Sequence, residues 1–157
     1  MKIRLYHARV LTMEENRPVF LGEVWVKDGK IIYLPEEGKG GRELNPEKVP
    51  EIRWDLEIDC EGNLLMPGFK DAHTHSAMTF LRSYADDVPL QQWLNEKIFP
   101  LEAKLSGEDI YHLTRLAVLE YLTSGITSVF DMYLRPDDTA RACADMGMRC
   151  VLTSGLN

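Results

Sequence analysis

Patterns typical of strands and of helices alternate over the second part of the chain. A strand pattern covers 64–75, a helix pattern 106–125, a second strand 126–133, a second helix 136–147 and a third strand 148–153. Strands that alternate with helices form βα units, whose strands lie parallel in one sheet with right-handed connections. The chain is therefore predicted to be an α/β protein with a parallel sheet in its second part.

The first 64 residues have a different pattern, which predicts a small β domain over 1–64. Two β-rich runs in 22–33 flank Asp28-Gly29, a pair that favours the positive φ values of a tight hairpin turn. Residues 35–50 are rich in Glu, Gly, Lys and Pro, which indicates an exposed loop. Apolar and charged residues then alternate from 52 to 59, as in a strand that covers a core with one face only. We expect antiparallel strands of the sandwich type.

The first strand of the parallel part ends in His73 and His75. Residues at i and i+2 of a strand lie on one face, so both imidazoles point to the same side, with Asp71, while Thr74 points to the other. Imidazole nitrogens bind divalent transition metals, most often zinc, although iron and manganese also accept them. Asp71 lies one step deeper, so it would orient an imidazole or be purely structural. A pair of surface histidines without any ligand is the alternative interpretation.

The string PGFKDAHTH at 67–75 resembles the first metal-binding strand of the amidohydrolase superfamily. The continuation HSAMTFLRSYADDVPLQQWLNEKIFPLEAKL at 75–105 resembles the branch that deaminates 5-methylthioadenosine, S-adenosylhomocysteine and related adenosines. The resemblance implies that 65–157 is the start of a (β/α)8 TIM barrel, truncated after about the third barrel strand. A complete barrel takes roughly 250 residues, so a chain of 157 residues would be the amino-terminal fragment of such an enzyme.

The resemblance also implies a mechanism and residue roles. A divalent metal at His73 and His75 would activate water for attack on C6 of an adenosine-type substrate, and ammonia would leave. Trp93 would pack against the thioether or ribose side of this small nucleoside-like molecule, and Glu102 would accept hydrogen bonds from the ribose hydroxyls. The structural alternatives are an aromatic core anchor for Trp93 and a solvated helix carboxylate for Glu102.

The family pattern calls for two more histidines, a proton-carrying glutamate and an aspartate from later strands. His112 is the only histidine after His75, and it is interpreted as structural, as is His7. The catalytic Glu and Asp are therefore expected beyond Asn157, and the fragment alone should be inactive.

Two positions near the ends of the later strands bear on the substrate pocket. Asp131 either lines the pocket or caps the turn that follows it, and the cap is favoured. Thr153-Ser154-Gly155 stands where related enzymes often carry an arginine for a substrate carboxylate. This difference weakens the expectation of a preference for S-adenosylhomocysteine over less charged adenosines.

Charge and cysteine content exclude several classes of protein. The 18 basic and 25 acidic side chains give a formal net charge of −7 without a long basic run, so nucleic-acid binding is not expected. No apolar run approaches the length of a membrane span, and we expect a cytoplasmic protein. Cys60, Cys143 and Cys150 are odd in number and lack Cys-x-x-Cys spacing, so they are expected to be ordinary thiols.

Two other functions are compatible with these patterns. The complete protein could be an amidohydrolase acting on guanine, a triazine or a cyclic amide. The 157-residue chain could instead be a non-enzymatic module that binds a partner through its open barrel edge, since unpaired strands demand cover. The sequence leaves open whether copies of the chain form a homo-oligomer.

Overall fold

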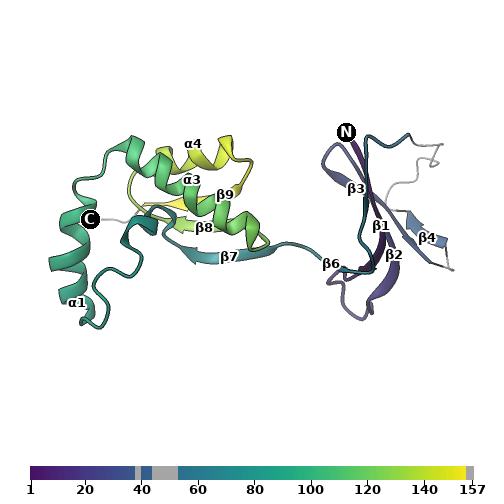
Figure 1. The fold of residues 1–157 in the computed structure, drawn as a ribbon, viewed down its shortest axis with the longest axis horizontal. Coiled ribbons are helices and arrows are strands. Elements are labelled where there is room, and N and C mark those ends of the chain that lie inside the picture. Colours follow the sequence, from purple (N-terminus) through teal and green to yellow (C-terminus); the bar gives the residue numbers. More distant parts are fainter. Residues whose placement is uncertain (38–39, 44–52, 155–157) are drawn as a thin grey trace. The chain divides into compact units, whose positions relative to one another are not determined.

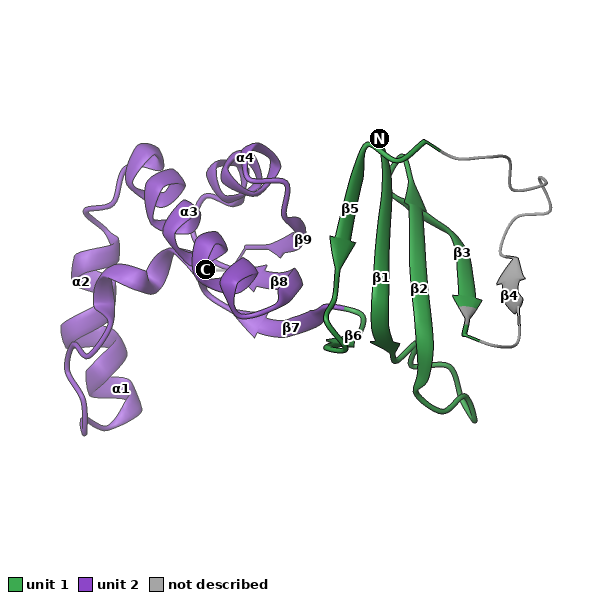
Figure 2. Cartoon of the chain, turned by 45° about the vertical axis from the view of Figure 1, so that its right-hand side comes forward, with its two compact units in different colours: residues 1–67 green, residues 68–157 purple. Residues whose placement is uncertain are grey.

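The computed structural model describes residues 1–37, 40–43 and 53–154 (Figure 1). The chain divides into two compact units, Met1–Pro67 and Gly68–Asn157 (Figure 2). The first unit contains a six-stranded sheet, and the second contains a three-stranded sheet with helices. The chain is therefore a mixed α/β protein, as predicted. No helix in the described ranges is long and apolar enough to cross a membrane.

The sheet of the first unit is mixed rather than purely antiparallel. Its strand order is β4-β3-β2-β1-β5, and β6 also pairs with β1. The expected antiparallel arrangement is right for β1 to β4 but wrong for β5 and β6, which run parallel to β1. Four reversals of chain direction bring β5 back to the direction of β1, at whose free edge it pairs. The strands are β1 (Lys2–Val10), β2 (Phe20–Lys27), β3 (Lys30–Glu36), β4 (Gly40–Glu43), β5 (Leu56–Asp59) and β6 (Leu64–Leu65).

The predicted hairpin is confirmed by the β2–β3 connection. Lys27 pairs with Lys30, and the two residues between them, Asp28 and Gly29, have φ values of 51° and 78°. These left-handed conformations are those of a two-residue hairpin turn, which explains the Asp-Gly pair. The predicted loop at 35–50 contains the short strand β4, and residues 38–39 and 44–50 of that loop lie outside the described residues.

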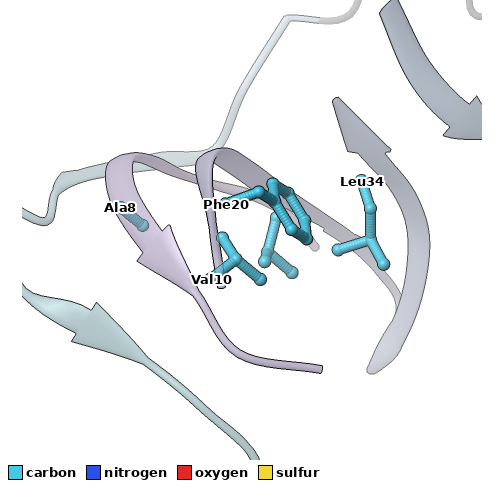
Figure 3. Close-up of a cluster of buried hydrophobic side chains, with 5 residues drawn as sticks. Ala8, Val10, Phe20 and Leu34 are labelled. Carbon is cyan, nitrogen blue, oxygen red and sulfur yellow. The ribbon is translucent and has the colours of Figure 1, made fainter. Parts of the chain in front are cut away.

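One face of this sheet carries the core of the first unit. Five side chains from β1, β2 and β3 are buried together, Ala8, Val10, Phe20, Val24 and Leu34, and Figure 3 shows the cluster. In β5, Leu56 and Ile58 remain 44% and 41% exposed. The prediction that this strand covers a core is therefore wrong for the described chain, because its apolar side chains have no second layer to pack against. The second layer of a sandwich stays a prediction.

The second unit begins with a parallel sheet in the order β7-β8-β9, as predicted. Helices α3 and α4 connect these strands, and a capping box between Ser106 and Asp109 fixes the start of α3, close to the predicted start of that helix at 106. Short helical turns occupy the segment between β7 and α3, where no element was predicted. The elements are β7 (Phe69–Thr74), a 3-10 helix η1 (Ser76–Leu81), α1 (Leu90–Gln92), a π-helix η2 (Trp93–Ile98), α2 (Phe99–Glu102), α3 (Gly107–Thr123), β8 (Ile126–Met132), α4 (Pro136–Asp145) and β9 (Arg149–Thr153).

Helices α3 and α4 cover one face of the parallel sheet. Buried side chains of α3, β8, α4 and the residue that precedes β9 form a shared core of Val118, Val129, Cys143 and Met148. Alternate residues of the strands point away from these helices, and Phe130, Met132 and Val151 are 45%, 43% and 56% exposed. The face of the sheet opposite α3 and α4 thus carries exposed apolar side chains in the described chain.

Candidate metal and substrate site

The two histidines of the predicted metal pair lie at the carboxyl end of β7. His73 is in the strand, and His75 immediately precedes η1. Their ring centroids are 5.1 Å apart, with an angle of 76° between the ring planes. The i, i+2 spacing thus brings the two imidazoles close together, as expected for neighbouring side chains on one face of a strand.

A contact with the next strand fixes the proton on His75. Its Nδ1 atom lies 2.6 Å from the carbonyl oxygen of Met132, the last residue of β8. A carbonyl oxygen can only accept a hydrogen bond, so Nδ1 is the donor, and in the neutral ring Nε2 then keeps its lone pair. This is the tautomer that a metal ligand requires when a backbone carbonyl orients its ring.

Hydrogen bonds from two elements hold the chain on both sides of His75. The buried carboxylate of Asp131 accepts a hydrogen bond of 2.7 Å from the backbone N–H of Ser76. The Tyr121 hydroxyl lies 2.5 Å from Thr74 Oγ1 and 3.1 Å from Ser76 Oγ. Burial raises the pKa of Tyr121, so its hydroxyl stays protonated. Helix α3 and strand β8 therefore restrain the residues that flank His75.

Asp131 has neither of its two predicted roles, because its carboxylate binds the start of η1 rather than the turn that follows Asp131. Its carboxylate satisfies a backbone N–H at the start of η1, and its side chain does not line the cavities beside His75. Asp71 plays a related local part, because its Oδ1 atom accepts a 3.1 Å hydrogen bond from the His73 amide. Within the described ranges no hydrogen bond joins Asp71 to an imidazole.

A cavity of about 340 Å³ in the second unit brings three of the predicted site residues together. Its walls come from η1, η2, α2 and the end of β8, and His75, Trp93 and Glu102 are among them. Glu102 is only 8% exposed, so the alternative of a solvated helix carboxylate is wrong. Trp93 is half-buried and belongs to none of the described core clusters. His73 is not part of this lining.

The cavity wall also contains Tyr133, which sequence reasoning did not single out. Tyr133 follows β8 directly, and its ring centroid lies 6.5 Å from that of His75. The available signal was its position, because residues that follow the carboxyl ends of parallel strands gather at one edge of the sheet. The predicted strand extended through Tyr133 and so hid this signal.

A second hollow, of about 380 Å³, lies in the first unit and does not have the character of a site. Its ionisable side chains include His7 and Glu23, which already have partners. His7 Nδ1 lies 3.1 Å from an Asp59 carboxylate oxygen, and Glu23 binds Arg4 through both oxygens. The pKa of Glu23 is lowered by this bond to Arg4. His7 is thus a structural residue, as predicted.

The donor set at the strand end fits half of a metal site. Two imidazoles lie side by side, and the tautomer of His75 leaves Nε2 available. Among residues 1–37, 40–43 and 53–154, no group of three or more His, Cys, Asp or Glu side chains could hold a metal ion. Further ligands would have to come from outside the described residues. His112 is exposed and pairs with Glu108 on α3, so it is not a candidate.

Replacing Asp131 by alanine should destabilise the second unit. The change leaves the buried Ser76 N–H without its charged acceptor, and losing a hydrogen bond to a charged group costs about 1.5–3 kcal/mol. Urea unfolding monitored by circular dichroism gives the free energy of unfolding. Asp131→Asn keeps an acceptor oxygen and should lose less, and Asp86→Ala, at an exposed site, should change little. Equal losses for the alanine and asparagine variants would contradict the capping role.

Known proteins resemble this chain over most or nearly all of its length. The Amidohydrolase family model matches residues 64–156. A 5-methylthioadenosine/S-adenosylhomocysteine deaminase of Syntrophomonas wolfei subsp. wolfei is 54% identical over 124 residues, which cover 79% of this chain and 29% of the relative. A 5′-deoxyadenosine deaminase of Methanosarcina acetivorans is 41% identical over 155 residues, which cover 98% of this chain and 33% of the relative. The chain thus spans about a third of the length of these curated relatives.

Solved structures share the fold at lower identity. The atrazine chlorohydrolase of Arthrobacter aurescens TC1 complexed with zinc has a TM-score of 0.74 and 21% identity, covering 97% of this chain and 35% of the other. The guanine deaminase of C. acetobutylicum with bound guanine has a TM-score of 0.70 and 21% identity, covering 97% of this chain and 36% of the other. Identity at this level speaks for the fold alone. Because the family model covers more than half of its residues, the chain belongs to the amidohydrolase family.

Proposed function

We propose that the complete protein is a metal-dependent amidohydrolase that hydrolytically deaminates an adenosine-type nucleoside. The observation that carries this proposal is the cavity that His75 shares with Trp93 and Glu102. The imidazole of His75 suits a metal, the ring of Trp93 suits an apolar part of a ligand, and the carboxylate of Glu102 suits a pair of hydroxyl groups. The names of the relatives at 54% and 41% identity support the same class of substrate.

The fold proposal is that β7, β8 and β9 are the first three strands of a (β/α)8 barrel, preceded by the small β domain. Two features support it. The three strands are parallel with helices on one face, and the other face carries exposed apolar side chains such as Phe130 and Val151. In a closed barrel that face is packed with apolar side chains. The histidines then lie at the carboxyl ends of the strands, where such barrels place their active sites.

In this proposal His73 and His75 hold a divalent metal, with zinc favoured by the two nitrogen donors and iron or manganese as alternatives. The metal, when bound, supplies the Lewis acidity that activates a water molecule. The contribution of this chain is to fix the positions of the two imidazoles and the orientation of the His75 ring. Met132 keeps the proton on Nδ1 of His75, while Tyr121 and Asp131 restrain the flanking residues.

The substrate would lie in the cavity beside the metal pair. The Glu102 carboxylate offers two oxygens, which suits the two vicinal hydroxyls of a ribose. The half-buried ring of Trp93 offers an apolar surface to the thioether or ribose side. Asp71 would act on His73 through the backbone N–H that it binds. The acid and base groups that move the proton would come from outside this chain.

Ammonia release by the complete, metal-loaded protein tests the proposal. We expect turnover with 5-methylthioadenosine, 5′-deoxyadenosine and S-adenosylhomocysteine, and little with guanine or a chlorinated triazine. If the protein turns over guanine or the triazine but no adenosine, the proposed substrate class is wrong, and another substrate class of the family takes its place. Inertness toward all of these C–N substrates, with stable capture of a second protein chain, would favour a binding module.

A further inference from the structure

A buried hydroxyl at the wall of the cavity has no partner. Tyr133 is 8% exposed, and its ring packs in the cluster of Ala77 and Ile110. Within the described ranges its Oη atom makes no hydrogen bond of acceptable geometry. A buried polar group without a hydrogen bond costs about 1–3 kcal/mol, and such groups are rare in folded proteins. The ring is explained by packing, but the hydroxyl is not.

The Glu102 carboxylate is the group that this hydroxyl faces. Burial raises the pKa of Tyr133 above its ordinary value, and the neighbouring Glu102 carboxylate raises it further. The phenol therefore stays protonated and can donate, whereas a carboxylate can only accept. Glu102 is itself 8% exposed and lines the same cavity as Tyr133. Two complementary buried groups thus lie close together, although their contact falls short of good hydrogen-bond geometry.

Other polar side chains of the cavity do not compete for this role. Nδ1 of His75 is already occupied by the Met132 carbonyl oxygen. The indole nitrogen of Trp93 is a donor and cannot accept from a phenol. Among the described residues that line the cavity, Glu102 is the only one with a carboxylate.

We propose that Tyr133 is a positioning residue, which donates a hydrogen bond to one carboxylate oxygen of Glu102 when substrate binds and turns the other oxygen toward the ribose hydroxyls. The inference rests on the proposed function. The contact between the two side chains falls short of hydrogen-bond geometry, and contacts of this kind often tighten only when substrate binds. Through this contact, Tyr133, which directly follows β8, would fix the position of the Glu102 carboxylate on α2.

The test compares Tyr133→Phe with the unsubstituted complete protein on adenosine and on 2′,3′-dideoxyadenosine. The variant keeps the packed ring and removes only the hydroxyl. We expect kcat/KM for adenosine to fall roughly 10-fold, mainly through KM, as for the loss of one hydrogen bond to a charged group. We expect almost no change for the dideoxy compound, which has no hydroxyls for Glu102 to bind. Tyr111→Phe removes an exposed hydroxyl that binds Asp145, and serves as the matched control.

A double substitution separates positioning from general damage. In a Glu102→Gln background, adding Tyr133→Phe should cost little more, because the two residues act on the same hydroxyls. Equal losses on adenosine and the dideoxy compound, or additive losses in the double variant, would overturn the positioning role. The midpoint of thermal unfolding of Tyr133→Phe should not fall, because the substitution removes a buried hydroxyl without a good hydrogen bond. If this variant nevertheless fails to fold, a loss for Glu102→Gln that does not depend on the two hydroxyls would still overturn the proposal. If the unsubstituted protein deaminates no adenosine, the proposed function itself fails.

Discussion

Replacing His75 by alanine in the complete protein should remove bound divalent metal and abolish measurable deamination. His75 supplies one of two neighbouring imidazoles, and its Nε2 lone pair is kept available by the Met132 carbonyl oxygen. Changes to residues that only orient metal ligands cost roughly 10–100-fold in affinity or activity, so loss of a ligand should cost more. Metal content by plasma mass spectrometry and ammonia release give the two readouts. His73→Ala should behave in the same way.

The matched control for these variants is His112→Ala. That histidine is exposed on α3 and pairs with Glu108, in the same unit but outside the cavity. Its replacement should leave metal content and turnover unchanged. A His75→Ala protein that keeps its full metal content and rate would show that the pair at the end of β7 does not hold the metal.

Replacing Glu102 by glutamine should lower kcat/KM for adenosine-type substrates roughly 10–100-fold, the equivalent of one lost hydrogen bond between a charged acceptor and a hydroxyl. The glutamine keeps the size of the buried side chain, but it loses the charge and one of two acceptor oxygens. Steady-state kinetics on 5-methylthioadenosine and on analogues without the 2′ or 3′ hydroxyl measures the effect. The loss should shrink as hydroxyls are removed from the substrate.

Glu96→Gln is the control for the glutamine substitution. Glu96 is exposed on η2 and accepts a hydrogen bond from Gln92, so its replacement should not change the kinetics. A loss for Glu102→Gln that is the same with and without the ribose hydroxyls would contradict its role in binding them.

Several elements of both units could be predicted because their signals are local. Ser106 and Asp109 cap α3 within one turn, and the turn at Asp28-Gly29 needs only its two residues. The proximity of His73 and His75 follows from the two-residue period of a strand. The short helical turns between β7 and α3 were missed, since none of them is long enough to show a helical period.

The contacts that make the site, by contrast, join distant parts of the sequence. His75 and the Met132 carbonyl oxygen are 57 residues apart, and Ser76 and Asp131 are 55 apart. The position of Asp131 at a strand end suggested that it lines the pocket or caps the turn that follows it. The structure shows a third role, because its carboxylate binds the N–H of Ser76 at the start of η1. Similarly, a carboxylate at position 102 gave no sign of its burial beside Tyr133, because burial depends on what the rest of the chain packs against it.

By itself the sequence determined the order of the elements, the pairing of the two imidazoles and the resemblance to a family, because each is written in neighbouring residues. Only the tertiary structure decided that β5 and β6 lie parallel to β1, which nitrogen of His75 carries its proton and which side chains share the cavity. Those features depend on strand order and on packing between segments that are far apart along the chain, and no local pattern encodes them.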